Sequence, residues 1–201
     1  TIDDNRVDIY DLEKENRQNN EEIDNSFMFS EERIKGYELE NVDTLSGGYL
    51  IEKDKENYFS SDKETAGFIT ESGYTFSIKA PKHASREQVE YISDYIQNVE
   101  DLIEAGDERC WDYIDIDSFV DYFLINEFFG NYDAGEHSTY MYKNSGGKLY
   151  IGPVWDFDQA MNNYYADEMD SETLAFQTKP FFEQLSKDTR FIDCLKERYS
   201  E

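Results

Sequence analysis

Two groups of carboxylates flank a predicted hairpin in the stretch from Asn126 to Asn163. The loop before the hairpin carries Asn131, Asp133, Glu136, His137 and Ser138, and the turn after it carries Asp156 and Asp158. Because the two strands of a hairpin are antiparallel neighbours, the sequence brings these two carboxylate groups together from opposite ends of one hairpin.

This layout suits phosphoryl transfer. One carboxylate orients an acceptor hydroxyl and takes its proton, while a second one, after the hairpin, holds the Mg²⁺ that bridges the nucleotide phosphates. The protein contributes mostly position and charge neutralisation. A divalent metal would also relieve the repulsion among the carboxylates.

Simpler explanations exist for the same residues. In a chain this acidic, two aspartate-bearing loops near one hairpin also arise by chance, and the aspartates then only cap turns and helices. A generic Ca²⁺ site is another alternative, although the spaced Asp/Asn-Gly-Glu pattern of an EF-hand is missing. Spacing alone leaves these alternatives open.

The charge balance excludes several classes of partner. The 201 residues include 46 Asp and Glu against 19 Lys and Arg, which gives a net charge of −27. Nucleic acids and anionic membrane surfaces are recognised by basic residues, so neither is an expected partner. The 16 Tyr and 14 Phe argue against disorder, and the length suits one globular domain or most of one.

The cysteines and the lengths of the apolar runs restrict the possible metal sites, disulfides and membrane segments. Cys110 and Cys194 are too few for a four-cysteine metal site, and either one disulfide or two free thiols remains open. No apolar run reaches the ~18–20 residues of a membrane span, so membrane insertion is not expected. No signal peptide is recognised, and the start at Thr1 suits a mature, trimmed or excised chain. Strong acidity with few cysteines favours a secreted or cell-surface bacterial protein.

The first half of the chain is predicted to be a polar segment followed by strands. Residues 1–45 form the leading segment, with a short strand at Arg6–Tyr10 and a linker or surface helix at 12–24. Residues 46–201 form the main body. Within it, Tyr49–Glu52 reads as a strand, 54–64 as a charged loop, and 67–79 as a hairpin that Pro81 stops.

Helices then alternate with one more hairpin. Ser85 and Gln88 fit a capping box before an apolar stripe that ends at Gly106, and a second helix runs from about Asp115 to Gly130. Residues 139–152 form a hairpin with a Gly-rich turn, and 180–199 are helical. The predicted fold class is α+β.

Several ordered motifs resemble the CotH-type spore-coat kinases, a family of atypical secreted or spore-surface protein kinases. The motifs in the first two thirds of the chain are Asn5-Arg6-Val7-Asp8-Ile9, Gly47-Gly48-Tyr49-Leu50-Ile51-Glu52, Ile78-Lys79-Ala80-Pro81 and Tyr113–Phe119. The strongest are Asn126-Glu127, Asn131-Tyr132-Asp133, Ser138–Lys143 and Gly147–Asp158. The resemblance implies a distant protein-kinase-like fold.

The resemblance also implies roles for single residues. Asp133 matches the catalytic-loop aspartate, which acts as base or orients a Ser/Thr hydroxyl. Asp156 matches the metal-binding aspartate, with Asp158 and Asn163 as further metal-site residues. The implied cofactor is ATP with Mg²⁺ or Mn²⁺, with Ca²⁺ as an alternative ion.

Three residues are expected to contact the nucleotide. Tyr49 and Tyr150 are candidates to stack on adenine, with ordinary core aromatics as the alternative. Lys79 is a candidate phosphate contact, with an edge-strand lysine as the alternative.

Two departures from the family pattern bear on activity. Ser138 stands where many relatives place an asparagine for the second metal, and serine is a weaker ligand. A basic strand and an Arg-Gly-Asn-Ser-like turn that precede this region in the family are not found. The chain is therefore expected to be the C-terminal portion of the family domain, lacking part of an N-terminal lobe that would be a partner for it.

Three functions follow as hypotheses. The first is a secreted or cell-surface kinase that transfers phosphate from ATP to protein Ser/Thr. The second is an inactive kinase-like module that binds a protein or cell-surface component. The third is an acidic extracellular domain stabilised by Ca²⁺ at the same carboxylates.

Overall fold

The computed structural model describes residues 45–54, 66–161, 163, 174 and 176–200. All of them belong to one compact unit, Val42–Glu201. The predicted strand at Arg6–Tyr10, the predicted segment at 12–24 and nearly all of the predicted loop at 54–64 lie outside the described residues.

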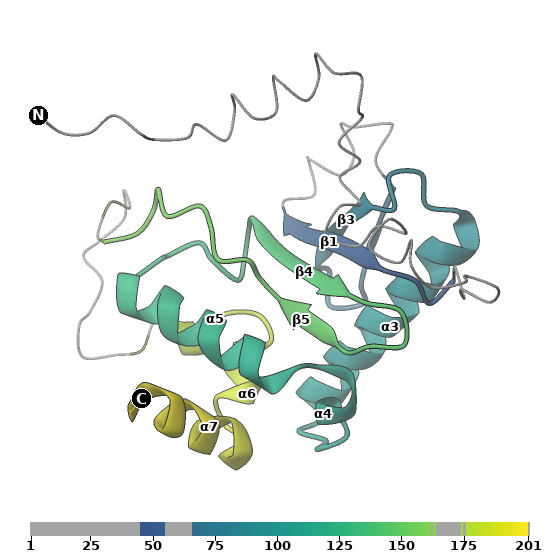
Figure 1. Ribbon diagram of the computed structural model, residues 1–201. Helices are drawn as coiled ribbons and strands as arrows, with labels where there is room; N and C mark the ends of the chain where they lie inside the picture. The colour runs from purple at the N-terminus through teal and green to yellow at the C-terminus, as the bar shows by residue number, and fades with distance from the viewer. Residues whose placement is uncertain (1–44, 55–65, 162, 164–173, 175, 201) are drawn as a thin grey trace, which may run out of the picture. The chain divides into compact units, whose positions relative to one another are not determined.

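One antiparallel sheet organises the described residues, with the strand order β2-β3-β1-β4-β5 (Figure 1). Its strands are β1 Tyr49–Asp54, β2 Gly67–Ile69, β3 Thr75–Ala80, β4 Thr139–Lys143 and β5 Leu149–Ile151. The two predicted hairpins are confirmed as β2–β3 and β4–β5. Between them lies β1, which pairs with both β3 and β4. This long-range pairing joins the two hairpins and places β1 beside the loop that precedes β4.

Strand alternation gives the sheet two different faces. Ile51 of β1 and Met141 of β4 are fully buried and lie opposite each other in the register, so they mark the core face. Glu52 pairs with Tyr140 one position away, so these two side chains point to the opposite face. The core face packs against helices, whereas the opposite face carries polar and aromatic side chains.

Helix α3 (Arg86–Glu104) begins at the predicted capping box. The Gln88 amide donates to Ser85 Oγ at 3.2 Å, and the Ser85 amide donates to Gln88 Oε1 at 2.8 Å. The stripe of Ile92, Ile96 and Val99 is fully buried. In Figure 1, α3 runs behind the sheet, where it covers the core face.

Helix α5 (Ile116–Phe129) also begins and ends where the sequence predicts. Asp115 caps its start by accepting from the Ser118 amide at 2.9 Å, and Gly130 ends it with the left-handed φ of 56° that suits glycine. The short α4 (Cys110–Tyr113) was not predicted. Among the described helices, none is long and apolar enough to cross a membrane.

The predicted helical segment at 180–199 is divided in two. It contains α6 (Phe182–Leu185) and α7 (Thr189–Ser200), preceded by the 3-10 turn η3 (Phe176–Thr178). Asp188 separates the two helices because its carboxylate accepts from the Arg190 amide at 2.7 Å and the Phe191 amide at 3.1 Å. These hydrogen bonds start a new helix at a point where the sequence pattern predicts a continuous one.

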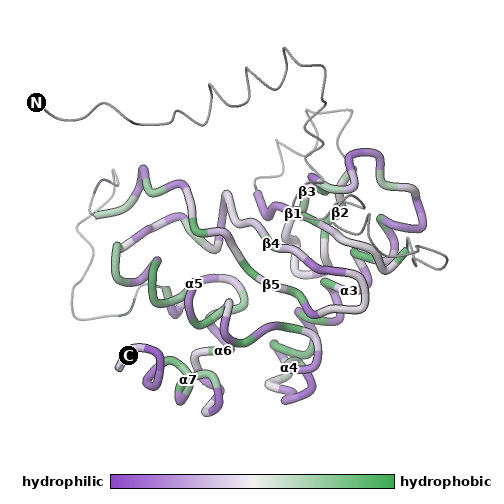
Figure 2. The backbone as a smooth tube through the Cα atoms, viewed as in Figure 1, coloured by the Kyte–Doolittle hydropathy of each residue, from purple (hydrophilic) through white to green (hydrophobic). Residues whose placement is uncertain are grey.

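Aromatic rings form much of the core between α5 and the C-terminal helices. Phe123 packs edge-on against Phe176 and Phe191, and Phe182 lies among them. Figure 2 shows apolar residues along β5, α4 and α5. Cys110 and Cys194 are both free thiols. The described structure is therefore α+β with a small antiparallel sheet, which confirms the predicted class.

Candidate functional site

Asn131 connects the two carboxylate-bearing segments. Its side-chain amide donates to Asn126 Oδ1 at 3.0 Å and to the Asp156 carbonyl at 3.2 Å, and its backbone amide donates to the Asn126 carbonyl at 2.9 Å. Asn126 is itself held on α5 by a bond to the Tyr122 carbonyl. The end of α5 therefore fixes the backbone of Asp156. Asn131 was predicted only as a loop residue, and this linking role was missed.

Asp133 begins a tight turn next to the aspartates that follow the hairpin. Its carbonyl accepts the amides of Glu136 and His137, both at 3.0 Å. Burial raises the pKa of the Asp133 carboxyl, and the negative charges of Asp156 and Asp158 raise it further. The structure therefore brings the three aspartates within electrostatic reach of one another, as the hairpin predicts.

The segment that carries Asp156 and Asp158 has an unusual backbone. Asp156 has a φ of 56°, which is uncommon for a residue other than glycine. Asn163 donates from its side chain to the Asp158 carbonyl at 2.6 Å, and the Met161 amide donates to the Phe129 carbonyl at 2.8 Å. Asn163 thus lies beside Asp158, where its amide shapes the turn.

A cavity of about 390 Å³ adjoins Asp133 on the polar face of the sheet. It is lined by Glu52, Asp54, Lys79, Asp133, His137, Ser138, Tyr140 and Trp155. Lys79 lies on β3, an inner strand, and its Nζ is 2.7 Å from Glu52 Oε2. The structure thus places Lys79 in the same cavity as Asp133, beyond the residues of β3 that pair with β2.

The aromatic wall of this cavity differs from the one predicted. Trp155 donates from Nε1 to the Ser138 carbonyl at 2.5 Å, and its ring lies 5.2 Å from that of Tyr140. Ser138 has a left-handed φ of 50°. Tyr140 and Trp155 both lie within the motifs quoted above, but their type and spacing alone did not single them out.

Tyr49 and Tyr150 do not line this cavity. Tyr49 is 1% exposed on the core face, where its ring stacks on Tyr91 at 5.8 Å. Tyr150 stacks on Tyr142 at 4.9 Å, toward the β5 edge of the sheet. Tyr49 is therefore a core aromatic, as the alternative predicts, whereas Tyr150 is half-buried on the face opposite the core.

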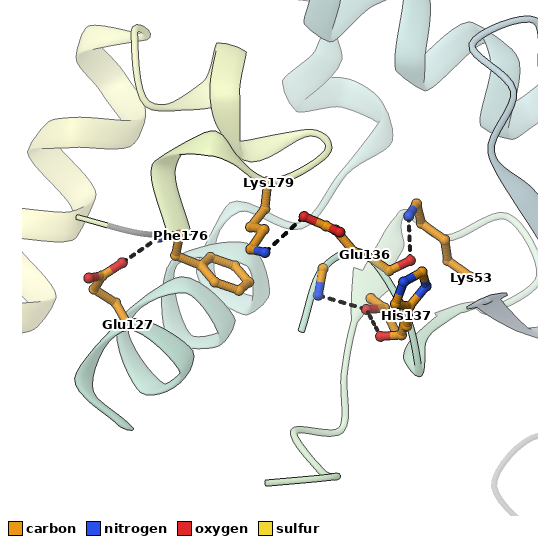
Figure 3. A network of polar contacts seen from close by, with 8 residues as sticks. Lys53, Glu127, Glu136, His137, Phe176 and Lys179 are labelled. Atoms are coloured by element: carbon orange, nitrogen blue, oxygen red, sulfur yellow. Dashed lines mark hydrogen bonds and ion pairs between the residues drawn. The ribbon is translucent and has the colours of Figure 1, made fainter. Parts of the chain in front are cut away.

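Two buried lysines hold the loop after Asp133 (Figure 3). Lys53 of β1 donates to the Glu136 carbonyl at 2.7 Å, and Lys179 donates to Glu136 Oε1 at 2.8 Å. Both lysines are 5% exposed. Burial lowers the pKa of Lys53 to about 8. Burial raises the pKa of Glu136, but the bond to Lys179 together with the charges of Lys179, His137 and Lys53 lowers it on balance. The loop is thereby clamped from the sheet and from the C-terminal segment.

The donor set fits a magnesium ion bound together with a nucleotide. Within the described ranges, no three His, Cys, Asp or Glu side chains lie close enough to hold a metal by themselves. Mg²⁺ in nucleotide sites commonly uses one or two carboxylates and takes its other ligands from phosphates and water. Asp156 and Asp158 would supply that number of carboxylates, and they lie within electrostatic reach of Asp133, which lines the cavity together with Lys79.

Of three comparisons with known proteins, one found a match, to a protein family. No curated protein and no solved structure matches the chain. The family described as CotH kinase protein matches residues 7–201, nearly the whole chain. The order of motifs, the paired aspartate segments and this match agree, and the chain belongs to the CotH kinase protein family.

Proposed function

We propose that the protein transfers the γ-phosphoryl group of ATP to a serine or threonine hydroxyl of another protein. The observation that carries this proposal is that Asp133 lines a cavity together with Lys79 and lies within electrostatic reach of Asp156 and Asp158. The family description names a kinase, and the proposed acceptor class and nucleotide follow the resemblance. The acidic composition supports a site of action outside the bacterial cell or on its surface.

Each residue has a distinct part in the proposed reaction. Asp133 accepts the proton of the acceptor hydroxyl, and its raised pKa brings it closer to the proton affinity that a base needs at neutral pH. Asp156 and Asp158 would hold Mg²⁺, which neutralises charge on the phosphates when bound. Lys79 would contact phosphate oxygens, and its ion pair with Glu52 at 2.7 Å orients it in the free protein.

The aromatic residues at this cavity suggest a revised base contact. Tyr140 and Trp155 line it, whereas Tyr49 is buried on the other face of the sheet. We therefore assign the stacking role to Trp155, which is 43% exposed, with Tyr140 behind it.

The test is a transfer assay on the full-length protein with radiolabelled ATP and Mg²⁺. Asp133→Asn should abolish labelling of the protein or of an added acceptor, and Asp156→Asn should remove both labelling and the rise in melting temperature caused by Mg-ATP. Asp112→Asn is the matched control, because Asp112 is exposed on α4 and away from the cavity.

The outcomes separate the proposal from the inactive-module alternative. Labelling that persists in Asp133→Asn would remove Asp133 from the catalytic role. A wild-type protein that neither transfers phosphate nor is stabilised by Mg-ATP would favour a binding module, consistent with Ser138 at the expected asparagine position.

A further inference from the structure

A second and larger cavity lies between α3, the β2–β3 turn and the segment that leads into α6. Its volume is about 790 Å³, within the range of small-molecule sites. Six carboxylates line it, namely Glu71, Glu100, Asp101, Glu104, Glu136 and Glu183, against the single lysine Lys53. His137 lines both this cavity and the smaller one, so the two are neighbours.

Glu100 is the unusual residue of this cavity. Its side chain belongs to the buried side of α3 and is 5% exposed, and neither of its carboxylate oxygens has a hydrogen-bond partner of standard geometry among the described residues. The side chains of Thr70 and Ser72 are polar neighbours of this carboxylate and partly offset the effect of burial on its pKa. Burying an incompletely hydrogen-bonded carboxylate is costly, and burial raises its pKa to about 7. A buried acid that lines a cavity and is incompletely hydrogen-bonded is suited to receive a donor from a ligand in that cavity.

Lys53 does not donate a hydrogen bond to the Glu100 carboxylate. Its ammonium group donates to the Glu136 carbonyl at 2.7 Å and lies 4.7 Å from the centre of the Tyr74 ring. It attracts Glu100 electrostatically but makes no hydrogen bond to it. Hydrogen-bonding capacity of the Glu100 carboxylate beyond its weak contacts with Thr70 and Ser72 therefore remains for a ligand.

We propose that this cavity binds an organic cation, an alkylammonium or guanidinium group, with Glu100 as the anion at its base. A guanidinium presents parallel N–H donors that match the two open oxygens of a carboxylate. A bare metal ion is a poorer fit, because no three acidic or histidine side chains among the described residues are close enough to enclose one.

Aromatic rings complete the proposed site. Tyr74 and Phe181 line the cavity with their ring centres 6.2 Å apart, and aromatic faces attract cations. Phe181 has a φ of 65°, a strained value for a side chain of this size. The surrounding structure thus holds this ring at the cavity wall despite a backbone cost.

The test measures binding by calorimetry on the full-length protein without nucleotide, so its result does not depend on phosphate transfer. The probes are agmatine, a free organic cation, and N-acetyl-argininamide, which presents the same group as a polypeptide would. Both are measured at 0.15 M NaCl, where diffuse attraction to an acidic protein is screened. Wild type should bind at least one probe, and Glu100→Gln should weaken binding at least tenfold.

Two further variants make the result decisive. Glu104→Lys changes an exposed residue at the cavity rim and should also weaken binding, whereas Glu197→Gln on the exposed side of α7 should leave it unchanged. Equal binding by wild type and Glu100→Gln would overturn the proposal, as would absence of binding by both probes or an equal loss in Glu197→Gln. Tighter binding of agmatine indicates a free cation as ligand, and tighter binding of the argininamide indicates a polypeptide side chain.

Discussion

Replacing Glu100 by glutamine should change how the stability of the protein depends on pH. Burial raises the pKa of Glu100 from the usual 4.5 to about 7 in the folded chain. The folded state therefore binds this proton more tightly than the unfolded state does. Stability from this group is fully present below pH 4.5 and is lost as the pH rises to about 7. The gap between the two pKa values corresponds to about 3 kcal/mol.

Glutamine cannot ionise, so the variant lacks this loss. Its amide also stays without a partner, but that cost is the same at every pH and shifts the whole curve. Lys53, whose pKa is lowered to about 8, begins to titrate at the upper end of this window and is electrostatically coupled to Glu100, so the two proteins are compared below about pH 7. Asp133, whose pKa is raised, contributes equally to both proteins. Below about pH 7, the difference between wild type and variant therefore reports mainly the ionisation of Glu100.

The assay is urea unfolding at several pH values from 4.5 to about 7, followed by the fluorescence of the buried Trp111. As the pH rises across this range, the free energy of unfolding of Glu100→Gln minus that of wild type should increase by about 3 kcal/mol. Glu197→Gln should follow wild type throughout. Parallel curves for wild type and Glu100→Gln would refute the reasoning, because they would mean that Glu100 is hydrated or paired in the folded protein.

Three other substitutions test the remaining arguments. Lys179→Met removes the bond to Glu136, and because that carboxylate is half-exposed, the free energy of unfolding should fall by only about 1 kcal/mol. In a transfer assay this variant should lose more in kcat than it changes in KM. Lys179→Arg should restore part of the lost kcat. Ser85→Ala removes the α3 cap and should cost about 1 kcal/mol in urea unfolding, whereas the same change at the exposed turn residue Ser145 should cost little. Asn131→Ala removes the hydrogen bonds from Asn131 to Asn126 and to the Asp156 carbonyl, and it should lower the free energy of unfolding by about 1–3 kcal/mol. Unchanged stabilisation by Mg-ATP in this variant would show that the position of Asp156 does not depend on Asn131.

Local sequence signals specified most of the helices and hairpins. The cap at Ser85, the cap at Asp115 and the left-handed Gly130 fixed the helix boundaries, because each acts within one turn of chain. The hairpin at 139–152 was readable for the same reason, and it placed Asp133 near Asp156 and Asp158. The prediction of one continuous helix at 180–199 was wrong, because the Asp188 side chain accepts a backbone hydrogen bond there and starts α7 as a new helix.

The tertiary structure decided which side chains share a cavity. The pairing of β1 with β3 and β4 puts Glu52, Lys79 and Tyr140 on one face and turns Tyr49 into the core. A one-residue shift in that register would exchange the two faces, and the residues that set it are far apart in the sequence. The isolation of Glu100 was equally unreadable, because a missing partner depends on everything that packs around a residue and not on its neighbours in the chain.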